Sequence, residues 1–316
     1  MDDLDIRIFR ALTSDHMKPS YFTPLKTSLR DIARKLKVDD VTVRNRYKRL
    51  QEKGILSGWK VFPNPSLFGY SLISMLVDTP PKSPKDDMIR KLKLVHGIVG
   101  IFDLYGDSLG VNLLFDSDAS LSRSTELISR ITSAENILQT RVASRAAQIN
   151  HLTDTDWGII RSLEEDASKS YVQVAKELGI TARTVKNRLL RLETNRALII
   201  GPTIAVAAID GMIGLILYYS YTKSELKDVV DEAILSHFDG SYLWATLTDP
   251  DRAYLILVAP TMASVKSYLK WTKQQPGVAS ARAEIVVEDI PSWNEGIEIF
   301  QGQQTFLQST LQRNRN

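Results

Sequence analysis

The sequence predicts an α+β protein in which two helix-turn-helix domains, winged or plain, alternate with two ferredoxin-like β-α-β-β-α-β domains. Three observations lead to this fold class: an internal repeat, a helical period at the start of each copy, and alternating strand and helix patterns after it. A chain of 316 residues has room for two to four domains.

The repeat is clearest in a basic helical segment. Ser28–Leu50 and Ser170–Leu192 align without a gap at an offset of 142, and nine of the 23 positions are identical. Upstream, Leu4–Leu12 corresponds to Thr155–Leu163 at an offset of 151. The first copy therefore has nine additional residues, near Met17–Thr23. We infer that the chain is a tandem duplication.

Each copy is expected to begin with three short helices and to continue as β-α-β-β-α-β, the ferredoxin-like order. Gly106-Asp107 and Asp249-Pro250-Asp251 supply the turn residues of the two central hairpins. In the first copy we expect helices at Leu4–Thr13, Ser28–Lys37, Val41–Lys53, Pro84–Val95 and Ala119–Thr132, and strands at Ser71–Val77, Val99–Tyr105, Val111–Phe115 and Ile137–Ala143. In the second copy we expect strands at Ile213–Tyr221, Tyr242–Leu247, Ala253–Val258 and Ala283–Val287, and helices at Ser224–Ser236 and Met262–Gln274.

These elements divide the chain into five segments. The expected helix-turn-helix domains are residues 1–62 and 149–203, the ferredoxin-like domains are residues 63–148 and 204–290, and a C-terminal extension covers residues 291–316. In that extension, apolar side chains close to one helical stripe favour a packing or interface helix over a disordered tail. They are Trp293, Ile297, Phe300, Leu307 and Leu311.

Composition excludes several classes of function. The chain has no cysteine, which rules out disulfides, thiolate metal sites and cysteine nucleophiles. Its longest apolar stretch, Met212–Tyr219, is far shorter than the roughly 20 residues of a membrane helix. Met1–Ile8 is acidic and lacks the apolar run of a signal peptide. We expect a cytoplasmic protein with no membrane partner, no metal and no cofactor.

The distribution of charge points to a polyanionic partner. Ser28–Lys60 holds ten Lys and Arg against four Asp and Glu, and Ser170–Ile200 holds six against two. The net charge of the whole chain is only +3, so the remainder is acidic. Two local basic concentrations inside an acidic remainder favour double-stranded DNA as the partner.

The last helix of each helical module has the pattern of a DNA recognition helix. Asp39 and Thr181 are expected to cap these helices, and Lys37 stands where the second copy has Gly179 in the turn before them. One face is apolar and the other basic, which suits the major groove. The alternative is that the basic face only keeps the helix solvated, and the occurrence of the same pattern in both copies argues against it.

The residues expected to contact DNA are Thr42, Arg44, Asn45, Arg46, Lys48 and Arg49 in the first copy, and Arg183, Thr184, Lys186, Asn187, Arg188 and Arg191 in the second. Asn45 and Asn187 are the expected base contacts.

These segments resemble the Lrp/AsnC, or feast/famine, family of prokaryotic regulators. The resemblance covers about 290 residues as two tandem copies and rests on Leu4–Ile8, Asp39–Leu50, Gly54–Gly58, Asn64–Tyr70 and the hairpin Gly106-Asp107. It implies a DNA-binding transcriptional regulator whose α+β domains pair face to face through their sheets. It also implies a small-molecule effector, such as an amino acid, that binds between those domains.

The resemblance makes the first copy the expected sensor. Gly106 and Asp107 are the candidate effector-binding residues, with plain turn chemistry as the alternative explanation. The second copy has Asp249-Pro250 at that place, where proline removes a backbone donor. The paired sheets could come from one chain or from two. A short linker at Ala147–Thr153 leads us to expect a homo-oligomer, at least a dimer.

Two other functions remain open at this point. Siroheme decarboxylases resemble the same architecture, but the four histidines here are dispersed, and the strands Val99–Tyr105 and Tyr242–Leu247 contain no His or Arg. A chromatin-like protein that coats DNA without a ligand is the second alternative. The function that we expect is sequence-specific transcriptional regulation rather than enzymatic catalysis.

Overall fold

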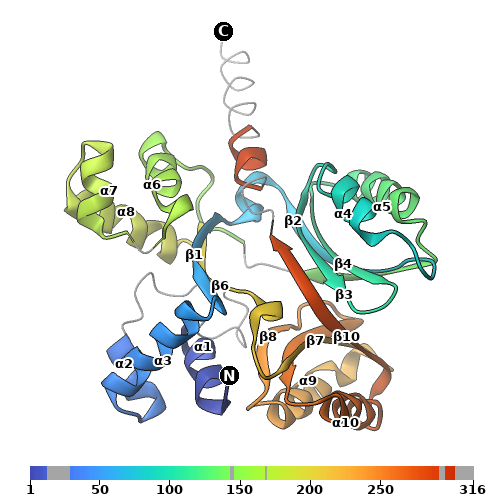
Figure 1. Cartoon of the computed structure of the whole chain (residues 1–316). Coiled ribbons are helices and arrows are strands. Elements are labelled where there is room, and N and C mark those ends of the chain that lie inside the picture. The colour runs from blue at the N-terminus through green and yellow to red at the C-terminus, as the bar shows by residue number, and fades with distance from the viewer. Residues whose placement is uncertain (13–28, 143–145, 168, 292–295, 303–316) are drawn as a thin grey trace.

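The computed structural model describes residues 1–12, 29–142, 146–167, 169–291 and 296–302 (Figure 1). Its α+β architecture confirms the predicted fold class. The additional residues near Met17–Thr23 lie outside the described residues. The first helix-turn-helix domain contains α1 (Asp3–Leu12), α2 (Leu29–Leu36) and α3 (Asp40–Glu52), and the second contains α6 (Asp154–Glu165), α7 (Tyr171–Leu178) and α8 (Ala182–Thr194). No helix in these described ranges combines the length and the apolar character that a membrane crossing requires.

The starts of α3 and α8 follow from their capping residues, as predicted. The Oδ2 atom of Asp39 accepts the backbone N–H groups of Val41 and Thr42 at 3.0 and 3.2 Å. Thr181 Oγ1 accepts the N–H of Thr184 at 3.1 Å. Each bond satisfies a donor that the first turn of a helix leaves unpaired.

Left-handed backbone positions recur at equivalent places in the two copies. In the turn before the recognition helix, Lys37 has φ 55° and Gly179 has φ 65°. After the recognition helix the order is reversed, with Gly54 at φ 67° and Arg196 at φ 55°. Each copy therefore keeps one glycine and has one side chain in a conformation that costs about 1 kcal/mol.

The two ferredoxin-like domains have the predicted element order. The first consists of β2 (Ser71–Asp78), α4 (Lys85–Leu92), β3 (Ile98–Leu104), β4 (Ser108–Phe115), α5 (Asp118–Thr132) and β5 (Asn136–Val142). The second consists of β7 (Ile213–Tyr221), α9 (Lys227–His237), β8 (Tyr242–Thr246), β9 (Arg252–Ala259), α10 (Met262–Lys273) and β10 (Val278–Pro291). Short 3-10 turns precede the first strand of each domain, at η1 (Pro65–Phe68) and η2 (Val206–Ala208), and η3 (Ser224–Leu226) leads into α9.

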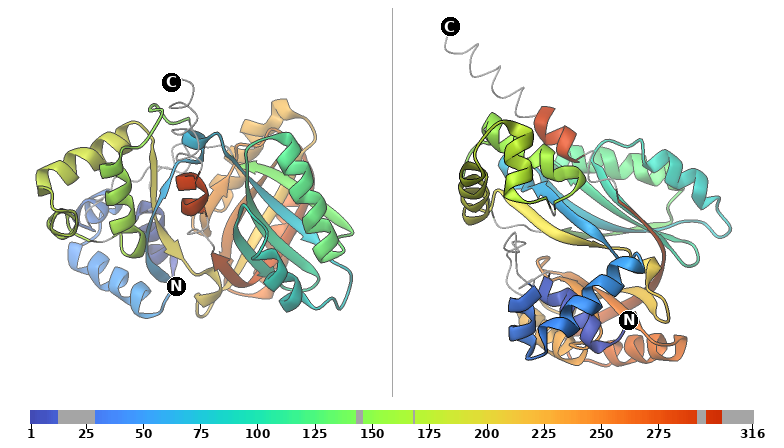
Figure 2. Two further views of the ribbon diagram at one scale, coloured as in Figure 1. Left: turned by 90° about the horizontal axis from the view of Figure 1, so that it is seen from above. Right: turned by 60° about the vertical axis from the view of Figure 1, so that its left-hand side comes forward.

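A two-stranded ribbon connects the helical modules to the rest of the molecule. The strands β1 (Leu56–Pro63) and β6 (Leu198–Ile204) follow the two recognition helices and pair antiparallel. The helix-turn-helix domains lie on either side of this ribbon, on one side of the molecule, and the ferredoxin-like domains lie on the other (Figures 1 and 2). The ribbon therefore joins the two helical modules to each other directly after their recognition helices.

Strand β10 joins the two ferredoxin-like domains into one sheet. Its first part, Val278–Ile285, pairs with β7, and its second part, Val286–Pro291, pairs with β3 of the other copy. The eight strands have the order β5-β2-β4-β3-β10-β7-β9-β8. We expected a strand at Ala283–Val287, and the observed strand is longer because it serves both halves.

The inner faces of the two half-sheets cover each other within the chain. Leu76 and Leu104 from the first copy share an apolar cluster with Ile216, Tyr254 and Val286 from the second. The helices pack on the outer faces, where each half has a core of its own. A second chain is therefore not needed to cover these faces, and the homo-oligomer that we expected stays a prediction.

A polar cluster lies at the seam between the halves. Arg282 of β10 has Nη1 2.7 Å from Asp78 Oδ1 and donates from Nη2 to Ser108 Oγ at 2.7 Å. Its Nε pairs with Glu284, whose side chain is 9% exposed. Burial raises the pKa of Glu284, while Arg282 opposes that shift. Arg282 thus provides the buried carboxylate with its cation and ties β10 to the first copy.

Candidate nucleic-acid interface

The recognition helices α3 and α8 expose the same positions. Val43 and Leu50 of α3, and Val185 and Leu192 of α8, are buried against the rest of their domains. The opposite faces carry the residues that we predicted to contact DNA. Exposed to solvent are Arg44, Asn45, Lys48 and Arg49 on α3, and Arg183, Lys186, Asn187 and Arg191 on α8. Thr42, Arg46, Thr184 and Arg188 are half-buried.

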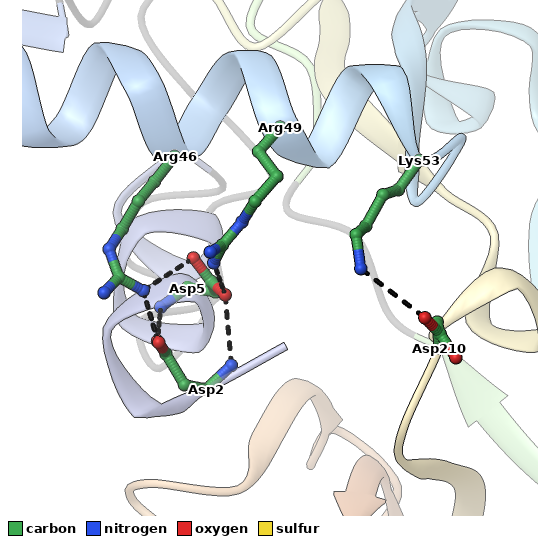
Figure 3. A network of polar contacts seen from close by, with 6 residues as sticks. All are labelled: Asp2, Asp5, Arg46, Arg49, Lys53 and Asp210. Atoms are coloured by element: carbon green, nitrogen blue, oxygen red, sulfur yellow. Dashed lines mark hydrogen bonds and ion pairs between the residues drawn. The ribbon is translucent and has the colours of Figure 1, made fainter.

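A fully buried carboxylate anchors α3 to α1 (Figure 3). Asp5 Oδ1 lies 3.0 Å from Arg46 Nη1, and Asp5 Oδ2 lies 2.6 Å from Arg49 Nη2. The backbone N–H of Asp2 also donates to Asp5 Oδ2, at 3.0 Å. The side chain of Asp2 lies 2.5 Å from Arg46 Nη1, and this bond lowers the pKa of Asp2.

The second copy repeats this anchor with Asp156, which is also fully buried. Arg191 Nη2 lies 2.7 Å from Asp156 Oδ2, and Arg188 Nη1 lies 3.5 Å from Asp156 Oδ1. Thr153 donates its backbone N–H to Asp156 Oδ2 at 2.9 Å. Two arginines of each recognition helix therefore bind a carboxylate of the first helix, which fixes how the basic face of the recognition helix is presented.

Our sequence reasoning named these four arginines but missed the two aspartates. A signal was present, because Asp5 and Asp156 are identical at the offset of 151 and fall among apolar residues. A carboxylate on the buried face of a helix needs a cationic partner. The arginines Arg46, Arg49, Arg188 and Arg191 are such partners, and they also remain at least partly exposed at the surface.

The two faces differ in the ion pairs along the helix. On α3, Arg44 Nε lies 3.0 Å from Asp40 and Lys48 Nζ lies 3.4 Å from Glu52. Such exposed pairs contribute about 0.3–0.5 kcal/mol each, so these cations can exchange partners at small cost. On α8 the place of Lys48 is taken by Leu190, which is 56% exposed.

One more ion pair lies near this face. Lys53, just after α3, has Nζ 3.5 Å from Asp210 Oδ2 in the loop before β7 (Figure 3). Both side chains are exposed, so the contact adds little stability.

In the Gly106-Asp107 hairpin, our candidate effector site, polar groups form hydrogen bonds with other residues of the same chain. Asp107 Oδ1 accepts the backbone N–H of Lys82 at 3.2 Å. The ammonium of Lys85 donates to the carbonyls of Leu104 and Gly106, at 3.0 Å for the latter, and pairs with Asp103. The hairpin thus binds an ammonium group, and in this structure a lysine side chain supplies it.

The corresponding hairpin of the second copy has a structural carboxylate. Asp249 is 6% exposed, and its Oδ1 accepts the backbone N–H groups of Asp251 and Arg252 at 2.9 and 3.3 Å. Its Oδ2 accepts the backbone N–H of Arg141, on β5 of the first copy, at 2.7 Å. Thr248 Oγ1 donates to the carbonyl of the same Arg141 at 3.2 Å. The hairpin thereby ties the second copy to an edge strand of the first.

The histidines do not form a cluster in the described part of the chain. His96 follows α4, His151 precedes α6 and His237 ends α9, while His16 lies outside the described residues. The ring of His237 stacks on Trp271 with centroids 3.5 Å apart, and burial lowers its pKa. Across the same described ranges, no group of three or more His, Asp or Glu side chains is placed to hold a metal ion.

Comparison with known proteins agrees with this geometry. The family model of the AsnC-type helix-turn-helix domain matches residues 1–51 and 152–193, which are the two helical modules. The HTH-type transcriptional regulator Ptr1 of Methanocaldococcus jannaschii is 31% identical over 121 residues, covering 38% of this chain and 76% of the relative. The HTH-type transcriptional regulator LrpA of Pyrococcus horikoshii is 33% identical over 119 residues, covering 37% and 77%. The chain belongs to the Lrp/AsnC family of helix-turn-helix transcriptional regulators.

A solved structure shows the same tandem arrangement. The siroheme decarboxylase NirDL matches 96% of this chain and 99% of its own, with a TM-score of 0.54 and 12% sequence identity. At that identity the likeness concerns the fold alone.

Proposed function

We propose that the protein is a sequence-specific DNA-binding transcriptional regulator in which α3 and α8 contact the same duplex. The observation that carries the proposal is the duplicated face: each recognition helix presents an asparagine beside basic side chains and is anchored by a buried aspartate. Asparagine pairs with adenine edges, and Arg and Lys bind guanine or phosphates. The position of both modules on one side of the molecule supports simultaneous contact (Figure 1).

Each predicted residue has a role in this proposal. Asn45 and Asn187 contact bases, while the partly exposed arginines contact phosphates from positions fixed by their aspartates. Leu190 replaces a lysine and suits the methyl group of a thymine. Because the two faces differ, we expect two half-sites of different sequence. The phosphate contacts are Arg44, Arg46, Lys48 and Arg49 on α3 and Arg183, Lys186, Arg188 and Arg191 on α8, with Thr42 and Thr184 beside them.

The first prediction concerns the two asparagines. Asn45→Ala and Asn187→Ala are each expected to weaken binding by about 1–3 kcal/mol, or about 5- to 150-fold, at the base that each contacts. Selection of bound sequences from a random library, followed by footprinting, measures the change. Lys48→Ala is the control, because it should weaken all sequences alike and reduce the salt slope by about one unit. If the base preference is unchanged in both variants, the assignment of Asn45 and Asn187 as base contacts is wrong.

A second prediction concerns assembly. Since the two half-sheets cover each other within the chain, we propose that one chain is the DNA-binding unit. Light scattering at micromolar concentration is expected to give the chain mass of 35.5 kDa. A stable particle of twice that mass would instead support the homo-oligomer that the short linker suggested.

A third prediction concerns ligands. We propose that an amino acid or similar amine acts at Gly106 and Asp107, where it replaces the ammonium of Lys85. A hundredfold excess over the dissociation constant is expected to stabilise the protein by about 2.7 kcal/mol, and Asp107→Ala should abolish that shift. Calorimetry with amino acids, nucleotides and an iron porphyrin is the measurement.

A shift of the thermal transition with the porphyrin alone would favour a decarboxylase function, which the likeness of the fold to the siroheme decarboxylase NirDL supports. No shift with any compound would favour the ligand-independent DNA-coating alternative.

A further inference from the structure

The two helix-turn-helix domains contact the ferredoxin-like domains in different ways. The first does so directly: the guanidinium carbon of Arg10 on α1 lies 4.1 Å from the centre of the Tyr242 ring on β8. Arg10 Nη2 also lies 2.8 Å from Asp239 Oδ1 in the turn before that strand. The fit is close, because a side chain at Gly240 would come within 2.9 Å of Asp3 Oδ1.

On the other half, a helical segment at residues 296–302 fills the corresponding place (Figure 1). Phe300 and Ile297 are buried in an apolar cluster with Trp157 of α6 and Val99 of β3. Arg161, the counterpart of Arg10 at the offset of 151, donates from Nη2 to Gln301 Oε1 at 3.0 Å. At this place the second module therefore contacts the C-terminal segment, and Trp157 of α6 also packs on Phe68 of η1, with ring centroids 5.8 Å apart.

The segment is held in one position by aromatic packing. The ring of Phe300 stacks on Phe68 with centroids 4.7 Å apart and an interplanar angle of 8°. It meets Phe62 of β1 edge to face, with centroids 5.3 Å apart. A Cβ atom at Gly296 would lie 2.7 Å from two atoms of the Phe62 ring, so the backbone of the segment approaches β1 closely.

We infer that residues 296–302 are a spacer that sets the position of the second recognition helix relative to the first, with Phe300 as its positioning residue. The inference rests on the proposed function, since a fixed separation matters only if α3 and α8 bind one duplex. Half-sites in neighbouring major-groove turns are about 10–10.5 base pairs apart, and each base pair adds about 3.4 Å. A rigid spacer therefore makes the protein selective for one distance between two half-sites in B-form DNA.

The experiment selects DNA from a library in which the two half-sites are separated by every spacing over one helical turn. The full chain is expected to enrich one spacing at least about tenfold over its neighbours, a free-energy difference of about 1.4 kcal/mol. Phe300→Ala and the milder Ile297→Ala should enrich the same half-site sequences but spread over several spacings. Glu298→Ala, an exposed position of the same segment, should keep the single spacing of the full chain.

Hydrogen exchange of the α6–α8 amides shows which variants keep the second module folded. A folded Phe300→Ala or Ile297→Ala variant that retains the single spacing overturns the inference. If the unaltered chain selects no DNA, the proposed function fails. If it selects both half-sites without a preferred spacing, the proposed function stands and the spacer is rejected.

Discussion

Asp5→Ala is expected to lower the free energy of unfolding by about 3 kcal/mol and to weaken specific DNA binding. The carboxylate is fully buried and accepts charge-assisted hydrogen bonds from Arg46 and Arg49. Each such bond contributes about 1.5–3 kcal/mol, and part of the loss is recovered when the surrounding side chains rearrange in the variant. Urea denaturation measures the first effect. For the second, affinity for the selected site should fall while the salt slope is retained, because both arginines stay available to phosphates.

Two variants serve as controls for Asp5. Asp2→Ala removes a 52% exposed partner of the same Arg46 and should cost less than about 1 kcal/mol. Asp156→Ala removes the equivalent buried group of the second copy and should reproduce the Asp5 result at the other half-site. Wild-type stability in Asp5→Ala would show that the anchor contributes nothing.

Asp249→Ala is expected to destabilise the chain by about 3 kcal/mol. The substitution removes a buried carboxylate that accepts the part-buried backbone N–H groups of Arg141, Asp251 and Arg252, and a hydrogen bond to a charged group contributes about 1.5–3 kcal/mol. Thermal unfolding followed by calorimetry measures the loss. Because Arg141 belongs to the other copy, hydrogen exchange should also increase along β5.

The matched control is Asp107→Ala in the first copy. Asp107 occupies the equivalent hairpin, but it is an exposed residue, and its carboxylate accepts the backbone N–H of Lys82. We expect a change below about 1 kcal/mol in the absence of ligand. Equal losses in the two variants would contradict the structural role assigned to Asp249.

Local signals in the sequence were sufficient to predict the recognition helices and the elements of the ferredoxin-like domains, whereas the strands of the ribbon, β1 and β6, were not among the expected strands. Capping residues such as Asp39 and Thr181 fix where the recognition helices begin, and these caps are observed. The β-α-β-β-α-β order followed from alternating apolar patterns that each strand and helix carries by itself. The left-handed turn at Lys37 was also predictable, because Gly179 marks the same position in the other copy.

Contacts between distant segments could not be predicted in the same way. The second part of β10 is strand because β3 lies beside it, and neither segment encodes its partner. The anchors at Asp5 and Asp156 depend on arginines 41 and 44 residues away in the first copy and 32 and 35 residues away in the second, which only the packed domain brings within reach. Within the C-terminal stripe, Ile297 and Phe300 are buried as a packing helix requires. Its other members, Trp293, Leu307 and Leu311, lie outside the described residues.

Strand β10 crosses from one half-sheet to the other, so dilution of the protein does not separate the two halves. Two separate subunits part when their concentration falls below the dissociation constant of the pair, and their DNA-binding geometry is then lost. Here β10 pairs with β7 and with β3 in the same chain, so the local concentration of one half around the other is fixed by covalent connection. The pairing of the two half-sheets within one chain therefore does not depend on the concentration of the protein.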